Sequence, residues 1–128
     1  MAEPQLVDEW IKKAEEDYQF AASVLEDSTF YAQICFHFQQ AAEKYLKTVI
    51  VAEDLEFQKV HDLVVLLKSC LSRKPELIRL MPECKLLNRF YIDTRYPVHW
   101  PTDYTKEGAI QAQAAAETIR DHVKACLK

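Results

Sequence analysis

Arg95 and His99 are the two side chains of this sequence best suited to phosphate chemistry, and only three residues separate them. Metal-independent RNA cleavage needs a base for the 2′-hydroxyl, an acid for the leaving oxygen and a cation for the phosphate. His99 can transfer the proton, and the guanidinium of Arg95 can hold the phosphate through two hydrogen bonds. The alternative is structural. In that case Arg95 anchors its loop by pairing with Asp17 or Asp93, and the imidazole lies on the surface.

A second set of polar side chains lies on one side of the segment 35–47, which contains neither proline nor glycine and is predicted to be helical. This arc carries, on successive helical turns, His37, Gln40, Lys44 and Lys47. Such a row can read a base through Gln40 and bind a phosphate through either ammonium group. The alternative is a solvated face, because Glu43 and Lys47 have the i, i+4 spacing of a surface ion pair. Phe36 on the same arc favours a covering helix over full solvation.

Asp17 lies inside an otherwise apolar helical arc, between Ala14 and Ala21. An unpaired carboxylate is costly to bury, so it either reaches solvent at the edge of the arc or pairs with a cation from another helix. Arg95 is our first choice of partner. Asp17 and Tyr96 complete the candidate ligand-binding residues.

Four aromatic residues surround the segment 95–104, which contains two prolines and is expected to form an ordered loop. They are Tyr91, Tyr96, Trp100 and Tyr104. Their rings can stack on a base, or they can fill the core and a dimer interface.

Hydrophobic periodicity predicts five helices, with a single glycine in the whole chain. The expected ranges are Leu6–Glu26, Thr29–Asp54, His61–Ser72, Glu83–Thr94 and Lys106–Leu127. We expect Ser28 or Thr29 to cap the second helix and Thr105 the last, with His61 in the first turn or cap of the third. The predicted fold is all-α, an antiparallel up-and-down four-helix bundle with an additional short helix.

The 128 residues are expected to form one domain, 1–128, with a formal net charge of -4. That charge provides no global attraction to nucleic acid or to an anionic membrane, although a local basic patch can still bind RNA. The sequence shows no membrane-spanning run and no signal peptide, so we expect a cytoplasmic protein. The four cysteines lack Cys-x-x-Cys spacing and the histidines are scattered. We therefore expect no metal site and no cofactor. Three of the cysteines lie among apolar residues of predicted helices, so we expect buried thiols.

Five short motifs follow one another along the chain. They are Trp10…Ala14-x-x-Asp17…Ala21, the run Cys35–Lys47 (CFHFQQAAEKYLK), His61-Asp62-Leu63…Leu66-Leu67, Tyr91-x-x-x-Arg95-Tyr96-Pro97, and Tyr104-Thr105 before an alanine-rich helix. In this order and at these distances they resemble the HEPN domain family (higher eukaryotes and prokaryotes nucleotide-binding), across nearly the whole chain. The resemblance implies a helical bundle that commonly forms a homodimer. It also implies a minimal nucleotidyltransferase as the partner in a toxin–antitoxin pair.

Many members of that family are metal-independent ribonucleases, whose signature is an arginine followed after four to six residues by a histidine. This sequence has three residues between Arg95 and His99, and Pro97 interrupts the corresponding helix. The tyrosine that some members carry two residues beyond the histidine is replaced here by Pro101. The chain is therefore more similar to an Arg-Tyr-Pro branch, and our interpretation is a dimeric module that binds a nucleotide or RNA. The alternative is a ribonuclease toxin that uses Arg95 and His99.

Overall fold

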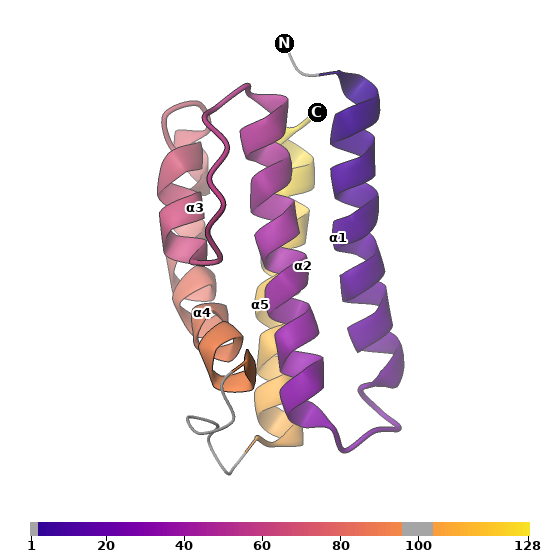
Figure 1. The fold of residues 1–128 in the computed structure, drawn as a ribbon. Coiled ribbons are helices and arrows are strands. Elements are labelled where there is room, and N and C mark those ends of the chain that lie inside the picture. Colours follow the sequence, from indigo (N-terminus) through magenta and orange to yellow (C-terminus); the bar gives the residue numbers. More distant parts are fainter. Residues whose placement is uncertain (1–2, 96–103) are drawn as a thin grey trace.

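The computed structural model describes residues 3–95 and 104–128, without the side chains of residues 92–95. The described chain is helical and has no strand. Its elements are α1 (Pro4–Val24), α2 (Tyr31–Ala52), α3 (Leu63–Cys70), a 3-10 helix η1 (Pro75–Leu80), α4 (Met81–Arg95) and α5 (Lys106–Cys126). Four long helices alternate in direction and α3 is the short addition, so the predicted fold is confirmed (Figure 1).

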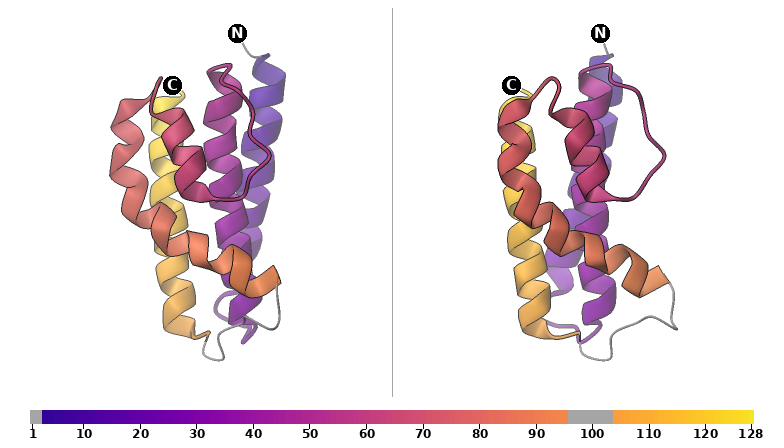
Figure 2. Two further views of the ribbon diagram at one scale, coloured as in Figure 1. Left: turned by 60° about the vertical axis from the view of Figure 1, so that its left-hand side comes forward. Right: turned by 90° about the vertical axis from the view of Figure 1, so that its left-hand side faces the viewer.

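Helix α2 is the centre of the bundle and packs against α1, α3, α4 and α5. Its buried apolar side chains include Phe38, Tyr45, Leu46 and Ile50. Because neighbours surround it, polar residues of the helix are buried as well. These are Gln39, Glu43, Lys47 and Thr48. The second half of α4 runs obliquely across the bundle, so that its end reaches α2 (Figure 2).

Two predicted helix starts are wrong, for local reasons. The N-cap of α2 is Phe30, without a side-chain cap, while the Ser28 hydroxyl accepts a hydrogen bond from the Phe30 N–H at 3.0 Å within the turn. The N-cap of α3 is Asp62, whose Oδ1 accepts from the N–H groups of Val64 and Val65. A carboxylate at this position satisfies two helix-end donors, so His61 lies outside α3 and neither begins nor caps it.

The cap of the last helix is confirmed. The Thr105 hydroxyl accepts from the Gly108 N–H at 3.0 Å. The buried side chains of α5 form a stripe at intervals of three or four residues, which comprises Ala109, Ala112, Ala116, Ile119 and Val123. The predicted buried thiols are also found, since Cys35, Cys70 and Cys84 are enclosed and each is free. Burial raises their pKa to about 12. No helix in the described ranges is both long and apolar enough to cross a membrane.

Candidate functional site

Most of the residues predicted from sequence to bind a ligand meet on one surface, where α1 and the segment after α2 flank the second helix. We call this surface the α2 face. It comprises Asp17, His37, Gln40, Glu43, Lys44, Lys47 and His61. Arg95 ends α4, but its side chain lies outside the described part, as do Tyr96 and His99. The roles assigned to these three residues stay predictions.

The Asp17 cluster joins α1 to α2 through one carboxylate. Asp17 accepts a hydrogen bond from Nζ of Lys44 at 2.5 Å and lies 3.3 Å from Nδ1 of His37. The carboxylate is 17% exposed, the lysine 30% and the histidine 35%. Asp17 therefore has the cation from another helix that we expected. That cation is Lys44 of α2, whereas our first choice was Arg95.

The Glu43 cluster repeats this chemistry on the other side of the face. Lys47 donates to Oε2 of Glu43 at 2.9 Å, and Nδ1 of His61 lies 3.0 Å and 3.1 Å from the two carboxylate oxygens. Only 5% of the Glu43 side chain and 9% of the Lys47 side chain are exposed. The interpretation of this ion pair as part of a solvated face is therefore wrong, because the segment carrying His61 and Phe57 covers it.

Two amides reinforce the Glu43 cluster. Gln40 donates to Oε1 of Gln39 at 2.8 Å and to Oε1 of Glu43 at 3.3 Å. Gln39 donates in turn to the backbone oxygen of His61 at 3.2 Å. The Gln40 amide nitrogen thus donates within the protein, so donation from Gln40 to a base would require these hydrogen bonds to be exchanged.

Aromatic rings border both clusters. The imidazole of His61 stacks on Tyr91, with centroids 4.4 Å apart and planes at 15°. Tyr91 also approaches Phe36, with 6.2 Å between the ring centroids. The helix that covers Phe36, as expected from the sequence, is therefore α4 of the same chain. On the opposite side the ring of His37 meets Phe20 edge-on at 4.9 Å. Each histidine is therefore positioned by a carboxylate and by a ring.

A sequence model of the HEPN domain matches residues 7–126. This chain belongs to the HEPN family. It is 29% identical to the protein named "Putative toxin MJ1304" of Methanocaldococcus jannaschii, over 132 residues that cover 93% of this chain and 86% of that protein. The recognition of the family from the sequence motifs is confirmed.

Two crystal structures share the HEPN fold of this chain. TT1696 from Thermus thermophilus is 30% identical with a TM-score of 0.77, covering 92% of this chain and 95% of its own. ST0689, described as an archaeal HEPN homologue, is 28% identical with a TM-score of 0.77, covering 95% and 98%. The bundle seen here is therefore the fold of its relatives.

The two histidines of the HEPN bundle are oriented by their carboxylates. An ionised carboxylate only accepts hydrogen bonds, so Nδ1 of His37 and Nδ1 of His61 carry the proton. In the neutral ring Nε2 is then the acceptor, and it lies on the side of the ring away from the carboxylate. Each imidazole can consequently accept a proton from a ligand without a metal ion.

The sequence prediction places neither His61 nor Glu43 among the ligand-binding residues, because the motif His61-Asp62-Leu63 is interpreted there as a helix start. Glu43 lies at the border of the apolar arc of α2, next to the buried Ala42, where a charge needs a partner. This position in the sequence indicates that the Glu43 carboxylate needs a partner. Which residue becomes that partner depends on how the segment 53–62 folds back over α2.

Two hollows adjoin the α2 face of this HEPN chain. A groove of about 320 Å³ is lined by Leu6, Glu9, Trp10, Lys13 and Lys44. A cleft of about 270 Å³ is lined by His61, Asp62, Asn88 and Tyr91. The groove borders the Asp17 cluster through Lys44, and the cleft borders the Glu43 cluster through His61.

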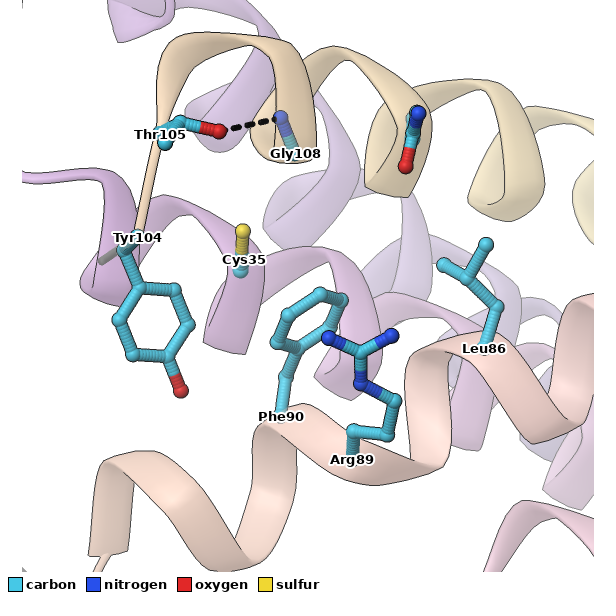
Figure 3. Close-up of a pocket in the computed structure, with 8 residues that line it drawn as sticks. Cys35, Leu86, Arg89, Phe90, Tyr104, Thr105 and Gly108 are labelled. Carbon is cyan, nitrogen blue, oxygen red and sulfur yellow. Dashed lines mark hydrogen bonds between the residues drawn. The ribbon is translucent and has the colours of Figure 1, made fainter. Parts of the chain in front are cut away.

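A third pocket lies at the start of α5 and is smaller, about 140 Å³ (Figure 3). Arg89 and the capped Thr105–Gly108 turn line it, with Cys35 between them. Burial raises the pKa of that thiol to about 12, so it is a weak nucleophile at neutral pH. This pocket offers less chemistry than the α2 face. No group of three metal-binding side chains occurs among the described residues.

Proposed function

We propose that the chain is a single HEPN domain, 1–128, that acts as a toxin-type module and binds a nucleotide or RNA on the α2 face. We further propose that it is a homodimer and is paired in the cytoplasm with a minimal nucleotidyltransferase. The observation that carries the binding proposal is the pair of carboxylate–lysine–histidine clusters on one face. Family membership and the relative named "Putative toxin MJ1304" support the toxin-type part.

Lys44 is the cation of this face that can reach a phosphate. Its ammonium group has three donor hydrogens, one of which Asp17 accepts. Since 30% of the side chain is exposed, the other donors can turn toward solvent and a ligand. Lys47 is buried over Glu43, so its charge contributes to the local potential and less to direct contact.

The binding proposal is tested by titrating the protein with a mixed-sequence RNA hexamer at several salt concentrations. Lys44→Met should weaken binding several-fold and lower the slope of log K against log salt by about one phosphate contact. Lys85→Met, a change at an exposed position of α4 outside the α2 face, is the matched control. Equal affinity and equal slope for wild type and Lys44→Met contradict the proposed site.

The pairing is tested by expressing the chain alone and together with a nucleotidyltransferase encoded beside it. We expect growth arrest in the first case, and relief with co-purification in the second. Light scattering of the isolated protein should give the mass of a dimer at micromolar concentration, and a monomer there contradicts the dimer.

A second candidate function is metal-independent RNA cleavage. The observation that favours it is the orientation of two imidazoles by carboxylates, which prepares each Nε2 for proton transfer. The sequence prediction assigns the reaction itself to Arg95 and His99. Cleavage of labelled RNA in chelator, lost in Arg95→Ala and His99→Ala, supports a ribonuclease. Absence of cleavage across several RNAs leaves the binding module.

A further inference from the structure

The cleft beside His61 is lined by His61, Asp62, Asn88 and Tyr91, and no lysine or arginine is among these described residues. Its volume of about 270 Å³ is slightly below the roughly 300–1,000 Å³ typical of pockets for whole small molecules. It therefore suits one ring-sized part of a ligand. Without a cation, that part should present hydrogen-bond donors and not a phosphate.

His61 supplies the first acceptor, and three contacts hold it in place. Glu43 accepts from Nδ1, Gln39 binds the backbone oxygen, and Tyr91 stacks on the ring. With Nδ1 facing the buried carboxylate, Nε2 is on the opposite side of the ring, and 47% of the side chain is exposed. In the neutral ring the lone pair of Nε2 is therefore on the side away from Glu43, and no hydrogen bond of Nε2 is found among the described residues.

Asp62 supplies the second acceptor. Its Oδ1 accepts from the N–H groups of Val64 and Val65 and from the side-chain amide of Asn88. Burial alone would raise the pKa of Asp62, but these bonds outweigh it and lower the pKa. The carboxylate is therefore ionised at neutral pH, and its other oxygen, Oδ2, is left for a ligand. Asn88 is itself held by the Leu63 N–H at 2.8 Å.

We propose that this cleft binds the 2′,3′-diol of a ribose, at the 3′ end of an RNA or in a free ribonucleotide. The 2′-hydroxyl donates to Nε2 of His61 and the 3′-hydroxyl donates to Oδ2 of Asp62. Acceptors on two consecutive residues of the cleft can pair with two adjacent hydroxyl donors, and a deoxyribose leaves one acceptor unpaired. This assignment rests on the proposed nucleotide or RNA binding and names the part of the ligand that His61 contacts.

The experiment compares mixed-sequence hexaribonucleotides that differ only in their last residue, which carries both hydroxyls, lacks the 2′-hydroxyl or lacks the 3′-hydroxyl. Wild type should bind the diol at least about 10-fold more tightly than either deoxy form. A parallel titration with an equimolar mixture of ribonucleoside 5′-monophosphates, against their 2′-deoxy counterparts, distinguishes the free ribonucleotide from the RNA end.

Three variants locate the two contacts. His61→Phe keeps a ring on Tyr91 and removes both nitrogens, so the preference for the 2′-hydroxyl should disappear. Asp62→Asn keeps the oxygen that caps α3 and replaces the second one with an amide, so the preference for the 3′-hydroxyl should disappear. His122→Gln on α5 is the matched control and should retain both preferences. Melting curves verify that each variant is folded.

The outcomes separate the two proposals. Equal binding of the diol and deoxy hexamers by wild type overturns the ribose cleft and leaves RNA binding intact. Failure of every probe to bind overturns nucleotide binding and the cleft together. Preferences that survive in folded His61→Phe and Asp62→Asn overturn the assignment to these residues.

Discussion

The Asp17 cluster and the Glu43 cluster contain the same three kinds of side chain and differ in where the chain takes them from. In the first, the carboxylate comes from α1, and both of its partners lie on α2. In the second, Glu43 and Lys47 are one turn apart on α2, and the histidine comes from the segment before α3. The first cluster therefore joins two helices. The second fastens a non-helical segment onto a helix.

The two clusters differ more in how deeply their ion pairs are buried than in the distances between their side chains. The Asp17 carboxylate and Lys44 remain partly hydrated, whereas the Glu43–Lys47 pair is almost fully enclosed. Water can replace a lost partner at a partly exposed pair, but it cannot do so at a buried one. The same three kinds of side chain should consequently contribute differently to stability in the two clusters. The histidine of the more buried cluster is nevertheless the more exposed one, at 47% for His61 against 35% for His37.

The largest effect is expected from Glu43→Gln. This change leaves the ammonium of Lys47 enclosed without a counter-charge, so the free energy of unfolding should fall by about 3–5 kcal/mol. Chemical denaturation measures it. Adding Lys47→Met to Glu43→Gln removes the stranded charge and should restore most of the loss. If the double variant is as unstable as Glu43→Gln, the unpaired charge of Lys47 does not cause the loss of stability.

A smaller effect is expected from Asp17→Asn. Removing this charge should lower the free energy of unfolding by about 1–3 kcal/mol, toward the lower end because Lys44 can turn to solvent. The comparison of the two clusters rests on Asp17→Asn costing less than Glu43→Gln under the same denaturation conditions. An unchanged melting curve for Asp17→Asn would show that the ion pair of Asp17 and Lys44 does not stabilise the fold.

The segment that carries His61 is also held by the Asp62 cap, which provides a pH test. Asp62→Ala should destabilise by about 1 kcal/mol at neutral pH through loss of the cap. Since hydrogen bonds lower the pKa of Asp62 in the folded state, its contribution is present above the unfolded value near 3.8. It should be lost as the pH falls through the lower folded value. Denaturation of wild type and Asp62→Ala at neutral and acidic pH measures this contribution. A difference in unfolding free energy between the two proteins that grows on acidification would contradict the prediction.

The smallest effect is expected from exchanging the His37 imidazole for a ring without nitrogen. His37→Phe keeps the aromatic contact with Phe20 beside a partly hydrated carboxylate, so it should change stability by less than about 1 kcal/mol. His61→Phe keeps the contact with Tyr91 but removes a hydrogen bond to the buried Glu43, which retains Lys47, so it should cost about 1–2 kcal/mol. Thermal melting measures both. If His61→Phe costs as much as Glu43→Gln, then the histidine is a structural counterpart of the buried carboxylate and not a group available to a ligand.

The sequence was a good guide to helices and to which polar residues share a side of a helix. Periodicity depends on a rise and rotation common to all α-helices, so the stripe of α5 and the row from His37 to Lys47 follow directly from spacing. The same logic placed Asp17 beside a cation. It did not name Lys44, because the rotation of α1 against α2 is a property of their packed side chains.

Local sequence was a weaker guide where polar groups compete for the same helix end. His61 and Asp62 both precede α3, and Asp62 is the N-cap because its carboxylate accepts hydrogen bonds from two backbone N–H groups. Once Asp62 held that place, His61 was available to turn toward Glu43. Such a choice depends on distances across the fold that no local pattern contains.

By itself, the sequence determined the helical architecture, the HEPN membership and the identity of the charged residues on the second helix. These depend on periodic burial and on motifs that are read along the chain. Only the tertiary structure decided that Glu43 and Lys47 are enclosed, and that His61 closes over them while it lines a cleft. Residues 18 positions apart meet there because the segment after α2 folds back along it. Burial of a charge is a property of that return path and not of the residues themselves.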